Sequence, residues 1–321
     1  MYQALSILSG LFLLVAFSAC QRNEAPPPVI DAALVFINPG SLATEILTQD
    51  SLEGYFEHLS QRDLQLQFRQ LTDADTISLA AYREWLPQQL LSWEASIREK
   101  VAPIWTEVLH EAETRFPKLV PDTVQLLLTE DAPYGSHIYF TRNRAVIMPI
   151  SDLILADAAS LKNIFRHELF HLISRSHPEW REDMYRLANF VPAPTKIKWP
   201  TALSARRLTN PDAPNDDYMV AYEGAFYLPI LYAPEDIQGE AGGALFSENI
   251  RFQYHRLQAD SILEDRLPIW TATEITEANS AYIIHPEEIL AEHFAFLLGG
   301  AATTYPDELA DLEAFLRARG E

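Results

Sequence analysis

The chain has 321 residues, of which 48% are hydrophobic and 21% charged, so it can bury a sizeable core and is not a disordered or low-complexity protein. Acidic residues outnumber basic ones by 45 to 24, and the resulting net charge of −21 is spread along the chain. A field of this sign repels polyanions, which excludes nucleic acid and anionic membrane surfaces as partners.

The chain begins with an apolar run that ends in small residues and at Cys20, its only cysteine. The run is shorter than the roughly 20 apolar residues of a spanning helix, so residues 1–20 predict an export signal rather than a membrane anchor. Their end, Phe17-Ser18-Ala19-Cys20, resembles a bacterial lipoprotein signal. The resemblance implies lipidation of Cys20 and attachment to the cell envelope, on its periplasmic or outer-membrane face. The alternative is an ordinary cleaved signal.

Two segments of different composition follow this signal. Residues 21–29 contain three consecutive prolines and predict a short exposed tether. Residues 30–118 predict an N-terminal helical region, because apolar residues such as Ile46, Leu47 and Phe56 recur at helical spacing. No chemistry is assigned to this region, and we expect it to form one compact unit with residues 119–321.

A small sheet is predicted next in the chain. Residues 123–128, 136–140 and 145–148 are short apolar or β-branched runs separated by turn residues, which is typical of a hairpin or meander. Pro149 would suit an edge strand, because proline has no N–H for a ladder. Further strands are predicted at 219–222 and 225–229. The expected fold class is therefore α+β, helix-rich, with a small antiparallel or mixed sheet.

Residues 161–175 carry the strongest chemical signal, the sequence His167-Glu168-Leu169-Phe170-His171, or H-E-x-x-H. Apolar residues around it recur at helical spacing and predict a largely buried helix. Residues four apart lie on one face of a helix, so both imidazoles can bind one metal ion while Glu168 reaches a water held by that ion. The alternative is a pair of hydrogen-bonded core histidines beside a surface glutamate.

A small sheet, an edge strand and then an H-E-x-x-H helix is also the order found in zinc metallopeptidases, the zincins, which this part of the chain resembles. The resemblance implies one Zn²⁺ held by three protein ligands, with a fourth position open to water. It also implies that an extended peptide binds along the edge strand by strand addition.

Two residues compete for the third ligand position. His177 stands ten residues after His167, which is the spacing of the metzincins, although Ser174 occupies the place of their glycine. A side chain at that place resists the sharp turn that brings the third histidine round. The sequence therefore favours His177 as a loop histidine before Pro178, without excluding it as a ligand.

The second candidate is Glu288, on a helix predicted for residues 286–298 because Pro286 suits its start and Gly299 its end. Glu288 and Glu292 are four residues apart and share one side of this helix. The arrangement resembles the second ligand helix of the gluzincins, the thermolysin-like peptidases. That resemblance implies that Glu288 binds zinc and that Glu292 orients a zinc-bound histidine. A solvated acidic helix face is the alternative.

Residues 206–218 are polar and rich in turn-forming residues, which predicts a long loop with a functional role. A hydrolase needs a hydrogen-bond donor for the oxyanion of its tetrahedral intermediate, and Tyr218 at the end of this loop is a catalytic candidate for that role.

The function expected from these motifs is that of an exported zinc metallopeptidase, in which Glu168 activates a zinc-bound water for attack on a peptide carbonyl. Two alternatives stay open. One is a surface binding or scaffold protein with a structural or vestigial zinc site. The other is hydrolysis of an amide or ester that is not a peptide bond.

Overall fold

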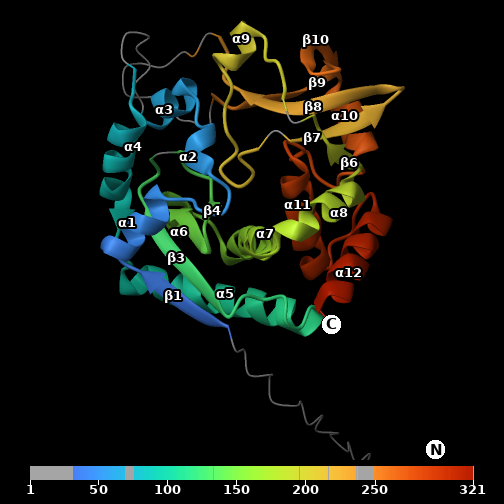
Figure 1. Ribbon diagram of the computed structural model, residues 1–321. Helices are drawn as coiled ribbons and strands as arrows, with labels where there is room; N and C mark the ends of the chain where they lie inside the picture. Colours follow the sequence, from blue (N-terminus) through green and yellow to red (C-terminus); the bar gives the residue numbers. More distant parts are fainter. Residues whose placement is uncertain are drawn as a thin grey trace, which may run out of the picture.

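The structure is a computed structural model that describes residues 32–68, 76–132, 134–194, 196–215, 217–235, 237 and 249–320. The expected signal, the tether and Cys20 lie outside these residues. Two five-stranded sheets and the helices packed on them make up the described fold (Figure 1). The α+β class expected from the sequence is confirmed.

The first sheet is mixed, with strand order β1-β3-β5-β4 and β2 attached to β3. Strands β1, β3 and β5 run parallel, whereas β4 is antiparallel to β5 and forms one edge. The strand bounds are Ala33–Ile37 for β1, Leu90–Leu91 for β2, Thr123–Thr129 for β3, Phe140–Arg142 for β4 and Ala145–Pro149 for β5.

Helices cover both faces of this sheet because its strands are apolar on both sides. Alternate residues of β3, among them Val124 and Leu126, pack into the main core with α5 (Ala95–Arg115) and α7 (Ala158–Ser176). Leu127, on the opposite face, packs into a second core with the first four helices. These are α1 (Ser41–Thr48), α2 (Tyr55–His58), α3 (Gln61–Gln67) and α4 (Leu79–Trp85).

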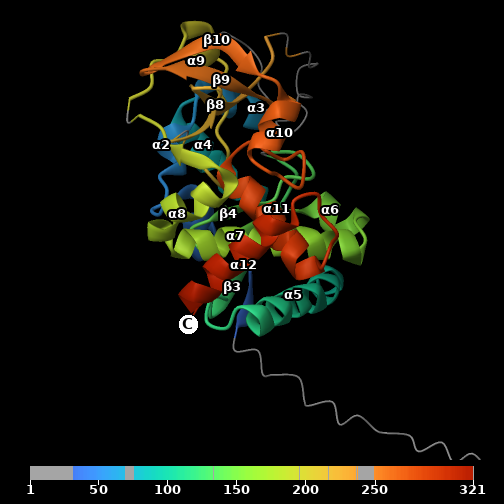
Figure 2. The ribbon, with the colours of Figure 1, turned by 90° about the vertical axis from the view of Figure 1, so that its right-hand side faces the viewer.

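The second sheet is antiparallel, has the strand order β10-β9-β8-β7-β6, and lies across the top of the molecule in Figures 1 and 2. One of its faces contributes Val220, Tyr254 and Leu267 to the main core. The other forms a smaller core around Leu228 and Ile230. The bounds are Phe190–Pro192 for β6, Tyr218–Tyr222 for β7, Ala225–Tyr232 for β8, Arg251–Gln258 for β9 and Ser261–Leu267 for β10.

The remaining helices surround α7, which runs through the middle of the molecule (Figure 1). Helix α11 (Pro286–Gly299) packs between α7 and the C-terminal α12 (Pro306–Gly320). The others are α6 (Ile150–Leu155), α8 (Arg181–Tyr185), α9 (Thr201–Ser204) and α10 (Ile269–Ile275), with 3₁₀ turns η1 (Leu86–Gln89), η2 (Pro178–Trp180) and η3 (Arg186–Ala188).

Several details differ from the sequence-based expectations. Strands β1 and β2 lie inside the region predicted to be helical, and β9 and β10 were not predicted. The expected hairpin is present between β4 and β5, but the three strands do not form a meander, because β3 and β5 are parallel neighbours. Pro149 lies on an interior strand rather than on the edge. The strand tolerates it because it is the last residue of β5 and begins the turn into α6.

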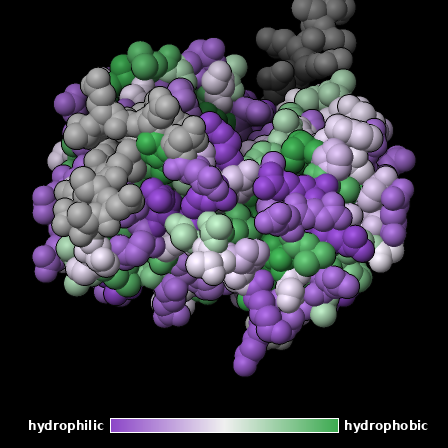
Figure 3. All heavy atoms as spheres, turned by 90° about the horizontal axis from the view of Figure 1, so that it is seen from above, coloured by the Kyte–Doolittle hydropathy of each residue, from purple (hydrophilic) through white to green (hydrophobic). Residues whose placement is uncertain are grey.

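Seen from above, hydrophilic and hydrophobic side chains are interspersed (Figure 3). Within the described ranges, none of the helices combines the length and the apolar character needed to cross a membrane.

Packing between α5 and α7 supports the helix that carries H-E-x-x-H. Trp105 of α5 is fully buried and stacks on Phe165 of α7, with ring centroids 4.7 Å apart and planes at 11°. At the rim of the contact, Glu111 forms ion pairs with Lys162 at 2.7 Å and with Arg166 at 2.9 Å. The side of α7 that faces α5 is therefore held by an apolar core with a charged border.

We predict that Trp105→Ala lowers the free energy of unfolding by about 3–5 kcal/mol, because it leaves a large cavity between α5 and α7. Urea denaturation would measure this loss. Trp270→Ala is the matched control, since the Trp270 side chain is 67% exposed and its removal should cost less than about 0.5 kcal/mol. Equal losses in the two variants would contradict the packing described here.

Candidate metal centre

Helix α7 presents its polar residues to the interior of the molecule. Its first turn is capped by Asp157, whose carboxylate accepts a hydrogen bond from the backbone of Ser160 at 2.7 Å. The His171 and Glu168 side chains are buried, and His167 is 12% exposed. Because the opposite side of α7 is held by α5, this polar face cannot turn toward solvent.

Helix α11 brings a second polar face against α7. Pro286 occupies the first turn, the His285 ring accepts a hydrogen bond from the Glu287 backbone at 3.1 Å, and Gly300 ends the helix with φ of +64°. Glu287 and Glu288 lie in the first turn and are fully buried. The helix dipole favours negative charge at this end, which stabilises the two carboxylates there.

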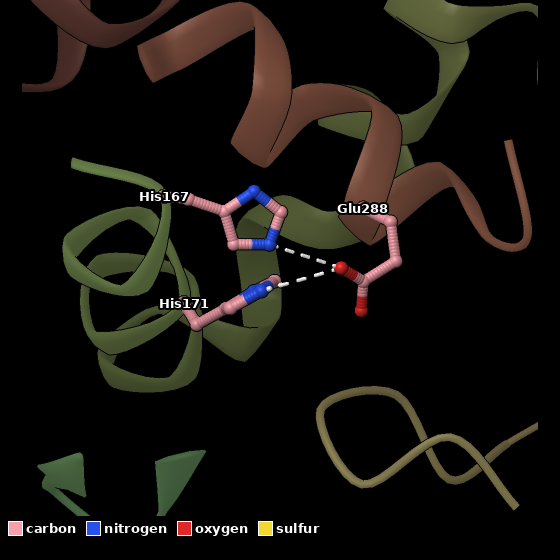
Figure 4. A group of neighbouring side chains, drawn as sticks. All are labelled: His167, His171 and Glu288. Carbon is pink, nitrogen blue, oxygen red and sulfur yellow. Dashed lines mark hydrogen bonds and ion pairs between the residues drawn. The ribbon is translucent and has the colours of Figure 1, made fainter. Parts of the chain in front are cut away.

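The two helices bring His167, His171 and Glu288 together (Figure 4). One oxygen of Glu288, Oε2, lies 3.1 Å from His167 Nε2 and 3.5 Å from His171 Nε2. All three ligand-type atoms lie within 4.8 Å of one another. Glu288 is 121 positions from His167 and 117 positions from His171 in the sequence, yet the three side chains share one small volume.

The arrangement fits a zinc ion. A tetrahedral zinc with bonds of about 2.0–2.1 Å separates its ligand atoms by about 3.3 Å, close to the distances from Glu288 Oε2. Two imidazoles and a carboxylate are a donor set that zinc favours in hydrolases. His171 Nε2 is buried and has no hydrogen-bond partner among the described residues, as is expected of a metal-ligand atom when no metal is bound.

A carboxylate fixes the orientation of each imidazole through its other nitrogen. Glu292 Oε1 lies 3.0 Å from His167 Nδ1, and Glu287 Oε1 lies 3.1 Å from His171 Nδ1. Glu287 is fixed in turn, because its Oε2 accepts hydrogen bonds from the hydroxyls of Tyr185 at 2.6 Å and Ser174 at 2.8 Å. Both Nε2 atoms therefore point toward Glu288, as metal-binding histidines require.

The charges of these groups depend on one another. Burial alone would lower the pKa of His167, but hydrogen bonds to Glu288 and Glu292 raise that pKa to about 9. Burial likewise opposes the protonation of His171, whereas the charges of Asp212 and Glu288 raise its pKa well above the usual range. Without a metal, the surrounding carboxylates therefore favour the protonated form of both imidazoles. A divalent ion that displaced both Nε2 protons would leave the net charge of the site unchanged.

Residues 207–213 form a buried loop beside the ligands. Asn210 donates a hydrogen bond to Glu288 Oε1 at 2.7 Å, which holds the oxygen that does not face the histidines. The carbonyl of Pro211 accepts hydrogen bonds at 3.1 Å from Arg142 and from Arg175. Asp212 accepts from the backbone and hydroxyl of Thr141, at 2.6 and 2.5 Å. The loop is buried because these bonds satisfy its polar groups.

Glu168 faces a cavity of about 180 Å³ that is also lined by His167 and Glu288. Its Oε2 is buried and has no hydrogen-bond partner in the part of the chain that the structure describes. Burial and the nearby charge of Asp212 raise the pKa of Glu168 to about 8, against the opposing charges of the two histidines. A carboxyl group with this pKa can exchange a proton near neutral pH, as a general acid–base group must.

Two residues named by the sequence analysis lie elsewhere. His177 stacks on Trp180 with ring centroids 3.6 Å apart and is not part of the three-residue group. Its side chain cannot turn inward, because α7 continues to Ser176 and Ser174 is engaged with Glu287. Tyr218 lines a different cavity, where its ring lies 4.6 Å from that of Tyr185, so the structure does not bring it into the cavity of Glu168.

Several residues of the site were missed by the sequence analysis. Glu287 directly precedes Glu288, and its place in the first turn of a largely apolar helix was the available signal. Asn210 and Asp212 fell within the predicted loop, but no local pattern distinguishes them from its other polar residues. Tyr139 belonged to a predicted strand and lines the cavity of Glu168.

The chain matches no protein-family model, and neither a curated protein nor a solved structure matches it. The chemistry of the site is therefore inferred from its own residues.

We predict that Glu287→Gln weakens zinc binding by about 10- to 100-fold, because the His171 ring loses the carboxylate that orients it. Competition with a chromophoric chelator would measure the affinity. Glu182→Gln is the matched control, since that side chain is 58% exposed and should leave the affinity unchanged. Wild-type affinity in Glu287→Gln would show that Glu287 does not act on the metal.

A second prediction concerns Asp63, which anchors the loop by accepting hydrogen bonds from the backbone and hydroxyl of Thr209 at 2.9 and 3.0 Å. Burial raises the pKa of Asp63 from 3.8 to about 6, although these bonds and those of Ser60 oppose the shift. The folded state then binds the proton more tightly than the unfolded state, so the stability contributed by Asp63 falls as pH rises from about 4 to 6.

Between these pH values the wild type should lose up to about 3 kcal/mol of unfolding free energy relative to Asp63→Asn, which does not titrate. Denaturation at several pH values would measure the difference. Asp183→Asn, on an exposed side chain, should follow the wild-type curve. Parallel curves for wild type and Asp63→Asn would contradict the assignment.

Proposed function

We propose that the protein is a zinc-dependent metallopeptidase in which His167, His171 and Glu288 hold one Zn²⁺. The observation that carries the proposal is the meeting of these three side chains beside Glu168, a residue that lines a cavity and has a buried, unpaired carboxyl oxygen. A metal-ligand set, a base and space for a substrate are the parts that metal-assisted hydrolysis needs.

When bound, the ion would supply a Lewis acid that polarises a carbonyl and lowers the pKa of water to about 7. Glu168 takes a proton from the attacking water and returns it to the leaving amine, so the carboxyl group is restored at the end of the cycle. Its neighbours His167 and His171 keep their rings in place through Glu292 and Glu287. Asn210 keeps Glu288 in place.

Beside α7, the first sheet of the described residues offers no free edge to an extended peptide. Strand β4 is its edge there, but all three of its residues are buried and the Thr141 backbone N–H already donates to Asp212. The strand addition that the resemblance to zincins implies would therefore require the loop of Asp212 to move, and a peptide substrate is proposed from the residues of the site rather than from this edge. Hydrolysis of another amide or an ester remains an outcome that the same chemistry permits.

The site of action that we propose is the bacterial cell envelope, with the protein held there by a lipid on Cys20. The support is the apolar run of residues 1–20 that ends at this cysteine. A surface binding protein with a structural or vestigial zinc site is the alternative function. It is disfavoured by the cavity and by the unpaired oxygen of Glu168, because a structural zinc site has no use for a base or for an opening.

We predict that Glu168→Gln retains stoichiometric zinc and loses hydrolysis of a peptide library by roughly 10²–10⁴-fold, because the amide cannot accept the proton. Glu288→Gln should instead lose zinc. Mass spectrometry of the products and metal analysis of the purified proteins would measure both effects. The exposed Glu99→Gln is the control and should behave as the wild type.

Wild-type activity should also be abolished by a chelator and restored by zinc. Hydrolysis in Glu168→Gln at the wild-type rate would refute the mechanism. A wild-type protein that holds zinc but cleaves no peptide would favour the binding-protein alternative.

A further inference from the structure

The hydroxyl of Tyr139 is buried without a hydrogen-bond partner. The side chain is 7% exposed, and none of the described residues bonds to its oxygen. Tyr139 directly precedes the edge strand β4, so its backbone position is fixed by the sheet. Burying an unpaired hydroxyl costs free energy, and native proteins keep such groups where something outside the folded chain pairs with them.

Tyr139 shares its cavity with Glu168, whose Oε2 is also unpaired. A hydroxyl that can donate and a carboxyl oxygen that can accept thus belong to two residues that line one cavity, and neither atom has a partner among the described residues. A ligand that offers an oxygen to Tyr139 and a proton to Glu168 satisfies both groups. A peptide carbonyl together with an attacking water has this pattern.

The other tyrosine in the cavity differs from Tyr139. Tyr282 is 44% exposed as a residue, whereas Tyr139 is 7% exposed. Burial and the charges of Asp152 and Glu168 raise the pKa of Tyr139, so its hydroxyl keeps its proton and remains a donor. No lysine or arginine lines the described cavity, so its donors are tyrosines, histidines and Asn163.

We propose that Tyr139 is a catalytic residue that donates a hydrogen bond to the substrate oxygen as that oxygen becomes negatively charged. This inference rests on the proposed function, because it assigns the oxyanion donor of the same site. A donor that is already buried and fixed needs no reorganisation during the reaction, which is the condition for strong stabilisation of a developing charge.

The test uses the full chain loaded with zinc and compares Tyr139→Phe with the wild type. Loss of an oxyanion donor should lower kcat for a library-derived peptide by about 100-fold or more, with little change in KM. The melting temperature of the metal-free variant should equal or exceed that of the wild type, because only an unpaired hydroxyl is removed. Tyr227→Phe, on β8 and outside this cavity, is the matched control for the loss of a hydroxyl.

A second readout separates this inference from the proposed function. Acetohydroxamate offers a carbonyl-type oxygen to a bound zinc ion, and calorimetry can measure its affinity for the zinc-loaded protein without any hydrolysis. Tyr139→Phe should bind it more weakly, and Tyr227→Phe should not. If the wild type cleaves no peptide but shows this weakening, the proposed function fails and the donor role of Tyr139 stands. Wild-type kcat, or wild-type hydroxamate affinity, in Tyr139→Phe would overturn the inference.

Discussion

The contact of the Glu288 carboxylate with two imidazoles joins the two helices on which the site depends. In the absence of a metal, the negative charge of Glu288 is placed between His167 and His171, at 3.1 and 3.5 Å from their Nε2 atoms. Burying any one of these groups alone would be costly, because a charge in an apolar interior requires a partner. In the packing of α7 against α11, the three groups therefore serve as partners for one another.

A set of buried carboxylates surrounds this contact and gives each ligand one allowed orientation. Glu292 and Glu287 each hold one imidazole, and Asn210 holds Glu288. Glu287 links α11 to α8 through Tyr185, and Arg181 of α8 donates to Ser174 of α7 at 3.0 Å. The site is thus connected to three helices by hydrogen bonds between buried groups, which resists rotation of any single ligand.

The loop of residues 207–213 shows how an irregular segment can lie in the interior. Its backbone cannot form a ladder along its length, so its polar groups take side-chain partners from the first sheet and its helices. Arg142 and Arg175 both donate hydrogen bonds to the Pro211 carbonyl. Both also form ion pairs with Asp50, which lies 3.4 Å from Arg142 and 3.6 Å from Arg175 and compensates their charge. The segments before α5 therefore help to place Asn210, although they line no part of the metal site.

The sequence by itself determined the local features of this protein. The periodicity around His167 and His171 was enough to predict α7, and Pro286 was enough to predict the start of α11, because helix spacing and capping are properties of neighbouring residues. Glu288 was already a candidate ligand for the same reason. The helix-rich α+β class also followed from such local patterns.

Only the tertiary structure brought Glu288, and not His177, beside His167 and His171. It also placed Tyr218 in another cavity and showed Glu287, Asn210 and Tyr139 near the three-residue group. It also decided that β3 and β5 are parallel neighbours and that β9 and β10 extend a second sheet. These features depend on contacts between residues far apart in the chain. The physical reason is that hydrogen bonds and burial act through space, whereas local periodicity reports only which side of an element is apolar.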